Sequence, residues 1–146
     1  MADTGPDTIL LDVFRTNQFR ERLIATALEG LPLPPEDYPF YVLVGVEGPL
    51  TPTALAARTA MPLSTVLYRV GRLERRGHAE RKPNPDDRRS YLLSLTADGQ
   101  KLLRAARPRF RALAEAVEGR LDGGVADLRA GLRELRDAIE TELTRE

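Results

Sequence analysis

Apolar residues recur along this chain at steps of three and four, the spacing of one face of an α-helix. This pattern covers most of the sequence and predicts a mainly helical protein. The predicted helices span residues 7–28, 38–47, 53–59, 63–76, 97–121 and 125–143.

Several residues next to these segments are typical of helix ends. Asp37 is predicted to cap the second helix, and Thr51 followed by Pro52 is a hydroxyl cap with proline at the first helical position. Gly77 is predicted to end the helix over residues 63–76, and Thr96 to cap the long helix that follows. Pro108 is predicted to interrupt that long helix.

The segment over residues 63–76 has two different faces. Its apolar stripe, predicted to face the core, consists of Leu63, Val66, Leu67, Val70 and Leu73. The opposite face carries side chains that can hydrogen-bond base edges and phosphates: Ser64, Thr65, Tyr68, Arg69 and Arg72. With the short helix over residues 53–59, this segment forms a helix–turn–helix pair of the kind that places its second helix in a DNA groove.

Two short extended runs follow the helix pair directly. Residues 78–82 and 90–95 flank a turn-forming stretch, residues 83–87, which is followed by Arg88 and Arg89. These features predict a β-hairpin with a basic tip. A helix pair followed by such a hairpin predicts a winged helix-turn-helix.

Composition excludes several kinds of chemistry. The 146 residues include no cysteine and one histidine, His78, so a disulfide, a cysteine nucleophile and a Cys/His zinc site are excluded. No catalytic motif is present, which argues against an enzyme, and no cofactor or metal is expected. No apolar run is long enough to span a membrane, and we expect a cytoplasmic protein.

Charge is unevenly distributed along the chain. The net charge is zero, but residues 50–90 carry nine basic and four acidic side chains, whereas residues 1–49 carry three and eight. A basic block in a neutral chain indicates a local anionic partner, and this block coincides with the predicted winged helix.

The segment over residues 50–103 resembles the winged-helix core of MarR-family transcription regulators. The resemblance is carried by the order and spacing of short motifs: residues 73–77 (LERRG), Glu80-Arg81, the Asp87-Arg88-Arg89 sequence, and Leu95-Thr96 with Gly99. Pro62 stands where the family usually has a capping residue, and Gly71 where an aspartate is common. These two departures bear on the base contacts rather than on the fold.

The resemblance implies a homodimer, built by the N- and C-terminal helices, that binds double-stranded DNA at a pseudo-palindromic operator. It implies that Arg89 enters the minor groove with Asp87 orienting it, and that Arg88 contacts a phosphate. The major-groove residues it implies are Ser64, Thr65, Tyr68, Arg69 and Arg72. Three other arginines, Arg75, Arg76 and Arg81, either contact DNA or pair internally with Glu74 or Glu80.

The resemblance also implies a small aromatic or anionic effector that weakens DNA binding, as in a ligand-responsive repressor. The candidate lining residues are Phe14, Asn17, Tyr38, Tyr41 and Phe110, each of which can equally be plain core or surface. His78 is expected to be structural.

The predicted organisation has four parts. Residues 1–6 form a disordered tail, residues 7–36 an N-terminal dimerisation helix with its linker, residues 37–96 the DNA-binding core, and residues 97–146 the C-terminal dimerisation helices. The alternative is a winged-helix module for protein or RNA binding, without operator specificity.

Overall fold

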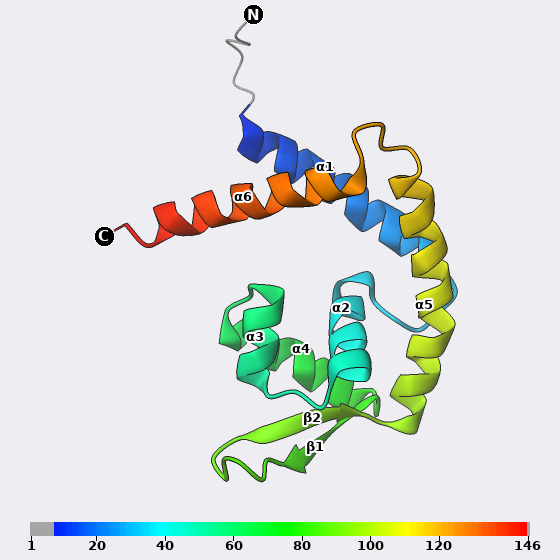
Figure 1. Cartoon of the computed structure of the whole chain (residues 1–146). Coiled ribbons are helices and arrows are strands. Elements are labelled where there is room, and N and C mark those ends of the chain that lie inside the picture. Colours follow the sequence, from blue (N-terminus) through cyan, green and yellow to red (C-terminus); the bar gives the residue numbers. More distant parts are fainter. Residues whose placement is uncertain (1–7, 146) are drawn as a thin grey trace, which may run out of the picture. The chain divides into compact units, whose positions relative to one another are not determined.

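A computed structural model describes residues 8–145, and the predicted tail over residues 1–6 lies outside the described residues. The chain is mainly helical with a small hairpin, as predicted (Figure 1). Its elements in chain order are α1 (Ile9–Ala27), a 3₁₀ turn (Pro35–Asp37), α2 (Tyr38–Val42), a π-helical turn (Leu43–Glu47), α3 (Pro52–Thr59), α4 (Leu63–Arg75), β1 (Ala79–Pro83), β2 (Tyr91–Leu95), α5 (Ala97–Glu118) and α6 (Val125–Leu143).

The chain folds into two compact units whose boundary falls inside α5. The first unit ends at Phe110 and the second begins at Arg111. The predicted interruption at Pro108 is absent, because α5 continues through this residue for 22 residues in all. A proline inside a helix removes one backbone donor, and here the helix continues on both sides of it.

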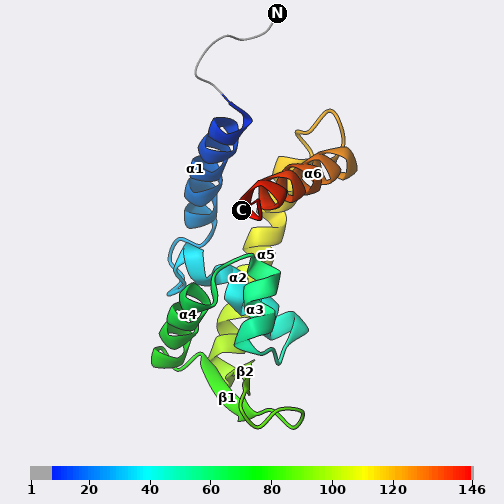
Figure 2. The same ribbon diagram turned by 90° about the vertical axis from the view of Figure 1, so that its left-hand side faces the viewer.

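The core of the first unit lies where α2, α3, α4, β2 and the first turns of α5 meet, as Figure 2 shows from a second direction. Its completely buried apolar side chains are Phe40, Tyr41, Leu55, Val66, Val70, Leu73, Leu93 and Ala106. Each of the elements in this core contributes one narrow apolar face, so the helix pair and the hairpin share a single core.

Side-chain caps fix where two of these helices start. The hydroxyl of Thr51 accepts a hydrogen bond from the backbone N–H of Ala54 at 3.1 Å, and that of Thr96 accepts one from Gly99 at 3.2 Å. Gly99 also packs so closely on the chain before β1 that a Cβ atom there would collide with the carbonyl oxygen of His78. Glycine is therefore required at this point.

Asp37 does not act as predicted. It stands at the N-cap position of α2, but its carboxylate makes no capping hydrogen bond. The carboxylate is completely buried instead.

The hairpin is antiparallel, with Ala79 opposite Leu95 and Pro83 opposite Tyr91. Leu93 joins it to the start of the helix pair, because Leu93 and Leu50 exchange two backbone hydrogen bonds of 2.8 and 3.1 Å. The two predicted extended runs are thus confirmed. The wing is attached to the helix pair through backbone contacts as well as through the core.

Helices α1 and α6 leave most of their apolar side chains exposed. In α1, Ile24 is the buried residue, whereas Ile9, Leu10 and Phe14 are exposed. In the second unit, no residue of α6 is buried in the described chain, and Leu128, Leu132, Ile139 and Leu143 are exposed.

Candidate nucleic-acid interface

The second helix of the pair, α4, buries a narrower apolar face than its sequence predicts. Val66, Val70 and Leu73 are completely buried. Leu63 and Leu67, predicted to belong to the same stripe, are 46% and 45% exposed, so that part of the prediction is wrong. The core reaches only one edge of α4, where Val66, Val70 and Leu73 pack among the other buried side chains.

The exposed face of α4 therefore combines polar and apolar side chains. Ser64 and Tyr68 are exposed, as the polar face predicts, and Thr65 is half-buried. Leu63 and Leu67 lie beside them, and Arg75 is exposed at the C-terminal end of the helix. Arg75 makes no ion pair with any described residue.

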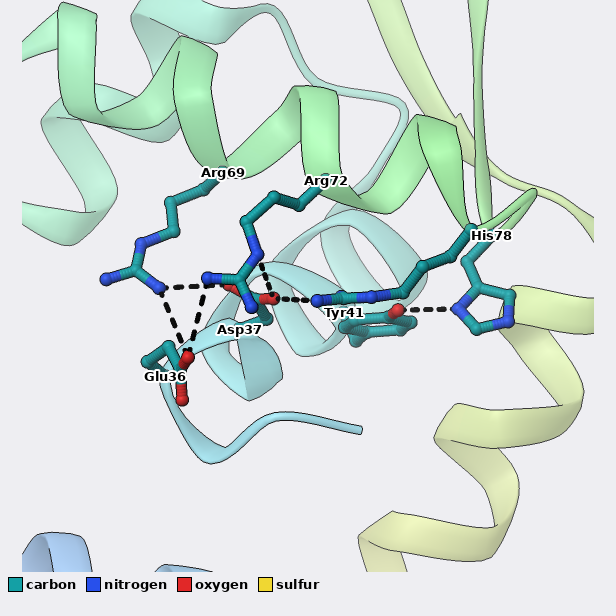
Figure 3. Close-up of polar contacts among 7 residues, drawn as sticks. Glu36, Asp37, Tyr41, Arg69, Arg72 and His78 are labelled. Carbon is teal, nitrogen blue, oxygen red and sulfur yellow. Dashed lines mark hydrogen bonds and ion pairs between the residues drawn. The ribbon is translucent and has the colours of Figure 1, made fainter. Parts of the chain in front are cut away.

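Arg69 and Arg72 lie at the edge of this face and are held by two carboxylates. Figure 3 shows both side chains reaching from α4 toward Glu36 and Asp37, at the start of α2. The closest nitrogen of Arg69 is 3.2 Å from Asp37 Oδ1, and Nη1 of Arg72 is 3.4 Å from Glu36 Oε1. The two arginine side chains are only 22% and 24% exposed, so they are engaged within the protein.

A third arginine, Arg76, completes this cluster. Its Nη2 lies 2.8 Å from Asp37 Oδ2, so Asp37 contacts three arginines that follow one another along one edge of α4 and its end. Arg76 thus pairs with Asp37, and not with Glu74 or Glu80, the internal partners that the sequence suggested. A completely buried carboxylate is costly unless such partners surround it. We call Glu36, Asp37, Arg69, Arg72 and Arg76 the arginine–carboxylate cluster.

A polar chain continues from the cluster to His78. Tyr41 Oη lies 2.6 Å from His78 Nδ1 (Figure 3). Burial raises the pKa of Tyr41, so its hydroxyl stays protonated at neutral pH and can donate to the imidazole. Burial, followed by the nearby charge of Arg76, lowers the pKa of His78. The histidine is therefore neutral and structural at pH 7.

The wing presents its arginines freely. Arg88 and Arg89 are exposed and form no ion pair with any described residue. Asp87 accepts a hydrogen bond from the backbone N–H of Arg89 at 2.9 Å, so it shapes the turn rather than gripping the guanidinium. Arg81 has a structural role, because its Nε and Nη2 lie 3.0 and 3.2 Å from the carboxylate of Glu74.

The residues suggested for an effector pocket come together only in part. Tyr38 and Tyr41 are buried in the core, and the rings of Tyr38 and Phe110 pack 4.8 Å apart. Phe14 and Asn17 are exposed on α1, where Asn17 accepts hydrogen bonds from Arg20. An open hollow of about 630 Å³ lies nearby in the first unit, and its lining residues are Leu31, Pro32, Leu33, Pro34, Arg76 and His78.

Sequence reasoning missed the role of Asp37 and the exposure of Leu67. The spacing of Arg69, Arg72 and Arg76 was one available signal, because steps of three and four place them along one edge of a helix. The acidic pair Glu36-Asp37, next to a buried run, was the other. Nothing in the sequence indicates that these two distant segments meet.

The helix pair, its shared core with the hairpin and the basic tip define a winged helix-turn-helix protein. Comparison with known sequences is in agreement, since residues 40–90 match the sequence profile of the MarR family. The chain belongs to the MarR family.

Relatives and solved structures support this assignment. The chain is 30% identical over 87 residues to the multiple antibiotic resistance protein MarR of Salmonella typhimurium, a match covering 60% of each chain. A probable transcriptional regulator from Pseudomonas aeruginosa has 30% identity and a TM-score of 0.78, with 88% of this chain and 97% of that chain covered. The Mycobacterium tuberculosis regulator MOSR, solved in complex with DNA, has a TM-score of 0.81 at 21% identity, covering 92% and 98%.

The chain spans about 60% of the length of the curated relatives that it matches. The likeness to MOSR shows the fold alone. No helix among the described residues is both long and apolar enough to cross a membrane.

Proposed function

We propose that this chain is a sequence-specific, double-stranded DNA-binding transcription regulator that acts as a homodimer on a pseudo-palindromic operator. The observation that supports this most directly is the combination of exposed side chains on one winged helix. Ser64 and Tyr68 lie on the open face of α4, and Arg88 and Arg89 extend from the wing without ion pairs among the described residues. Three relatives of the chain bear the names of transcriptional regulators or repressors.

The proposal assigns roles to individual residues. Arg89 enters the minor groove and Arg88 contacts a phosphate, while Ser64, Thr65 and Tyr68 face the major groove. Arg69 and Arg72 receive a different role from the one that the sequence resemblance implied. Because Glu36 and Asp37 already hold them, we assign them to positioning α4.

The homodimer follows from the same physical reasoning. One winged helix contacts little DNA, and a dimer places two recognition helices on half-sites about 34–36 Å apart. The exposed apolar residues of α1 and of α6 are the surfaces that such an assembly would bury.

Selection of bound duplexes from random-sequence DNA tests this function. We expect a pseudo-palindrome whose half-site centres lie one helical turn apart. Affinity should fall steeply with salt, with a log–log slope of about −0.9 for each phosphate neutralised. Arg88→Ala should flatten that slope by about one unit, while Arg104→Ala, an exposed arginine of α5, serves as the control and should leave it unchanged.

Two results would contradict the proposal. If the protein shows no duplex affinity at low salt, the protein-contact alternative is favoured instead. If it prefers single-stranded or double-stranded RNA over DNA of the same sequence, the RNA-binding alternative replaces operator binding.

We further propose that the regulator is a ligand-responsive repressor whose effector is a small aromatic anion. The hollow beside residues 31–34 supports this, because it is lined by apolar side chains together with Arg76 and His78. An anion there would compete with Asp37 for Arg76 and thereby loosen the hold on α4.

Benzoate is a suitable probe for the effector site. It should shift the NMR signals of His78 and weaken DNA binding in the native protein, and Arg76→Gln should abolish both effects. Signals that move only on α1 or in the core would place the effector elsewhere.

A further inference from the structure

The exposed face of α4 carries more apolar surface than a solvent-facing helix needs. Leu63 and Leu67 lie one helical turn apart and are both nearly half exposed, and Tyr68 beside Leu67 is more exposed still. The core of the first unit is completed without them by Val66, Val70 and Leu73. Within the unit, therefore, about half of the surface of each leucine stays exposed and is available to contact another molecule.

The two arginines at the edge of this face form ion pairs within the protein and are not free to contact bases. Arginine recognises guanine through two hydrogen bonds, but Arg69 and Arg72 lie against Glu36 and Asp37. The polar groups left on the face for base edges are Ser64, Thr65, the hydroxyl of Tyr68 and, at the C-terminal end of the helix, Arg75. Hydrogen bonding alone thus gives this helix few means to distinguish base pairs.

We propose that Leu63 and Leu67 read thymine methyl groups in the major groove, so that the half-site carries thymines at the positions these leucines face. This inference rests on the proposed DNA-binding function and names the feature of the operator that α4 recognises. The C5 methyl of thymine is the apolar group that base pairs display in the major groove, and side chains such as alanine, threonine and phenylalanine contact it. Burying a leucine methyl against it removes apolar surface of both partners from water.

Charge indicates DNA rather than protein as the occupant. The leucines lie within the segment of residues 50–90, which carries nine basic and four acidic side chains. Arg75, Arg88 and Arg89 are exposed in the same segment without an ion pair among the described residues. A stable protein interface buries about 800 Å² on each partner, with few charges at its centre, and two leucines among such arginines do not supply that.

The test uses the duplex recovered by selection, prepared a second time with deoxyuridine in place of every thymine. This change removes the methyl groups and keeps the Watson–Crick pairing. Each methyl contacted by the native protein should contribute about a fourfold loss of affinity on its removal, the effect of one buried CH₂-sized group. Single thymine replacements then locate the contacts along the half-site.

Leu67→Ala and Leu63→Ala complete the experiment as a double-mutant cycle. Each variant should bind the thymine duplex more weakly, and replacing the thymine that its leucine contacts should cause no further loss. Val46→Ala is the matched control, because Val46 is similarly exposed but lies outside α4. Val46→Ala should lose as much affinity as the native protein does when deoxyuridine replaces thymine. Thermal unfolding of each variant checks that the fold is intact.

The outcomes separate this inference from the function on which it rests. If the native protein binds both duplexes equally, methyl reading is wrong, while salt-dependent and sequence-specific binding still supports a regulator. If Leu67→Ala changes the association state in sedimentation and leaves DNA affinity intact, the leucines form a protein contact and the inference is overturned. If no duplex is bound at all, the proposed function itself fails.

Discussion

Asp37 is the residue on which most of the polar structure depends. It is completely buried and contacts Arg69, Arg72 and Arg76, so it fixes the start of α2 to one edge of α4. Removing one partner of such a cluster leaves the others without compensation, which costs more than the cluster contributes. The three arginines retain some exposure, and water partly compensates for the loss.

Asp37→Asn should therefore lower the free energy of unfolding by about 2–4 kcal/mol, measured by urea denaturation. Asp86→Asn is the matched control, because Asp86 is exposed in the turn of the wing, and it should change stability by less than about 0.5 kcal/mol. Equal effects of the two substitutions would show that the cluster contributes no stability.

His78 gives the fold a pH dependence. Burial and then the charge of Arg76 lower its pKa from the ordinary value of 6.5, and Asp98 opposes them. Because the unfolded chain binds the proton more readily than the folded one, stability is fully present above about pH 6.5 and is lost as the pH falls toward the lowered pKa. Protonation would also force Tyr41 to stop donating to Nδ1.

We expect the native protein to have a lower Tm at pH 5 than at pH 7.5. His78→Gln removes the titrating group and should reduce that difference, although other groups still titrate. Thermal unfolding followed by circular dichroism measures both. An unchanged difference in the variant would assign the pH dependence to other residues.

At the scale of the element, α4 has an unusual glycine at its centre. Gly71 is half-buried with an ordinary helical backbone, and a Cβ atom there would lie 3.3 Å from Nη1 of Arg75. That atom ends a flexible side chain and can move. Glycine in a helix costs about 0.5–1 kcal/mol relative to alanine, so Gly71 makes the folded protein less stable than alanine would.

Gly71→Ala should accordingly raise the free energy of unfolding by about 0.5–1 kcal/mol and leave DNA binding unchanged or tighter. Gly77→Ala is the contrasting variant, because Gly77 has a φ of +75° and alanine there should destabilise the protein. Thermal unfolding and a DNA titration measure the two effects. A large loss of affinity in Gly71→Ala would mean that the backbone of α4 approaches DNA closely at this residue.

At the scale of the whole molecule, two helices outside the proposed DNA-binding face expose apolar side chains. These are α1, with Leu10 and Phe14, and α6, with Leu128 and Leu132. Several exposed leucine and phenylalanine side chains on one helix are typical of a surface that contacts another protein chain.

Phe14→Glu should shift the protein from dimer to monomer, because it places a charge on the surface that the proposed dimer would bury. Sedimentation equilibrium measures the association state, and binding to duplexes with one or two half-sites measures its consequence. Arg15→Glu places the same charge on the next exposed residue, about 100° around α1 from Phe14, and should leave the dimer intact. A native protein that sediments as a monomer at all concentrations would contradict the proposed assembly.

Much of the fold was predictable because its signals are local. Thr51-Pro52, Gly77 and Thr96 start or end helices through bonds within a few residues of themselves, and the structure confirms each of them. The alternation around Leu93 and the turn before Arg88 likewise predicted the hairpin. The candidate interface was predictable only in part, since Ser64, Tyr68, Arg88 and Arg89 are exposed as expected, whereas Arg69 and Arg72 are engaged with carboxylates.

Periodicity and end signals along the chain determined which segments are helices, where the wing forms and where the positive charge accumulates, because each depends on neighbours in the sequence. Only the tertiary structure decided which side of α4 faces the core, and hence that Leu63 and Leu67 are exposed. It also decided that Asp37, 32 residues before Arg69, lies among the arginines of that helix. Such contacts depend on how the elements pack against one another, and helical spacing alone carries no information about which partner lies opposite a given edge.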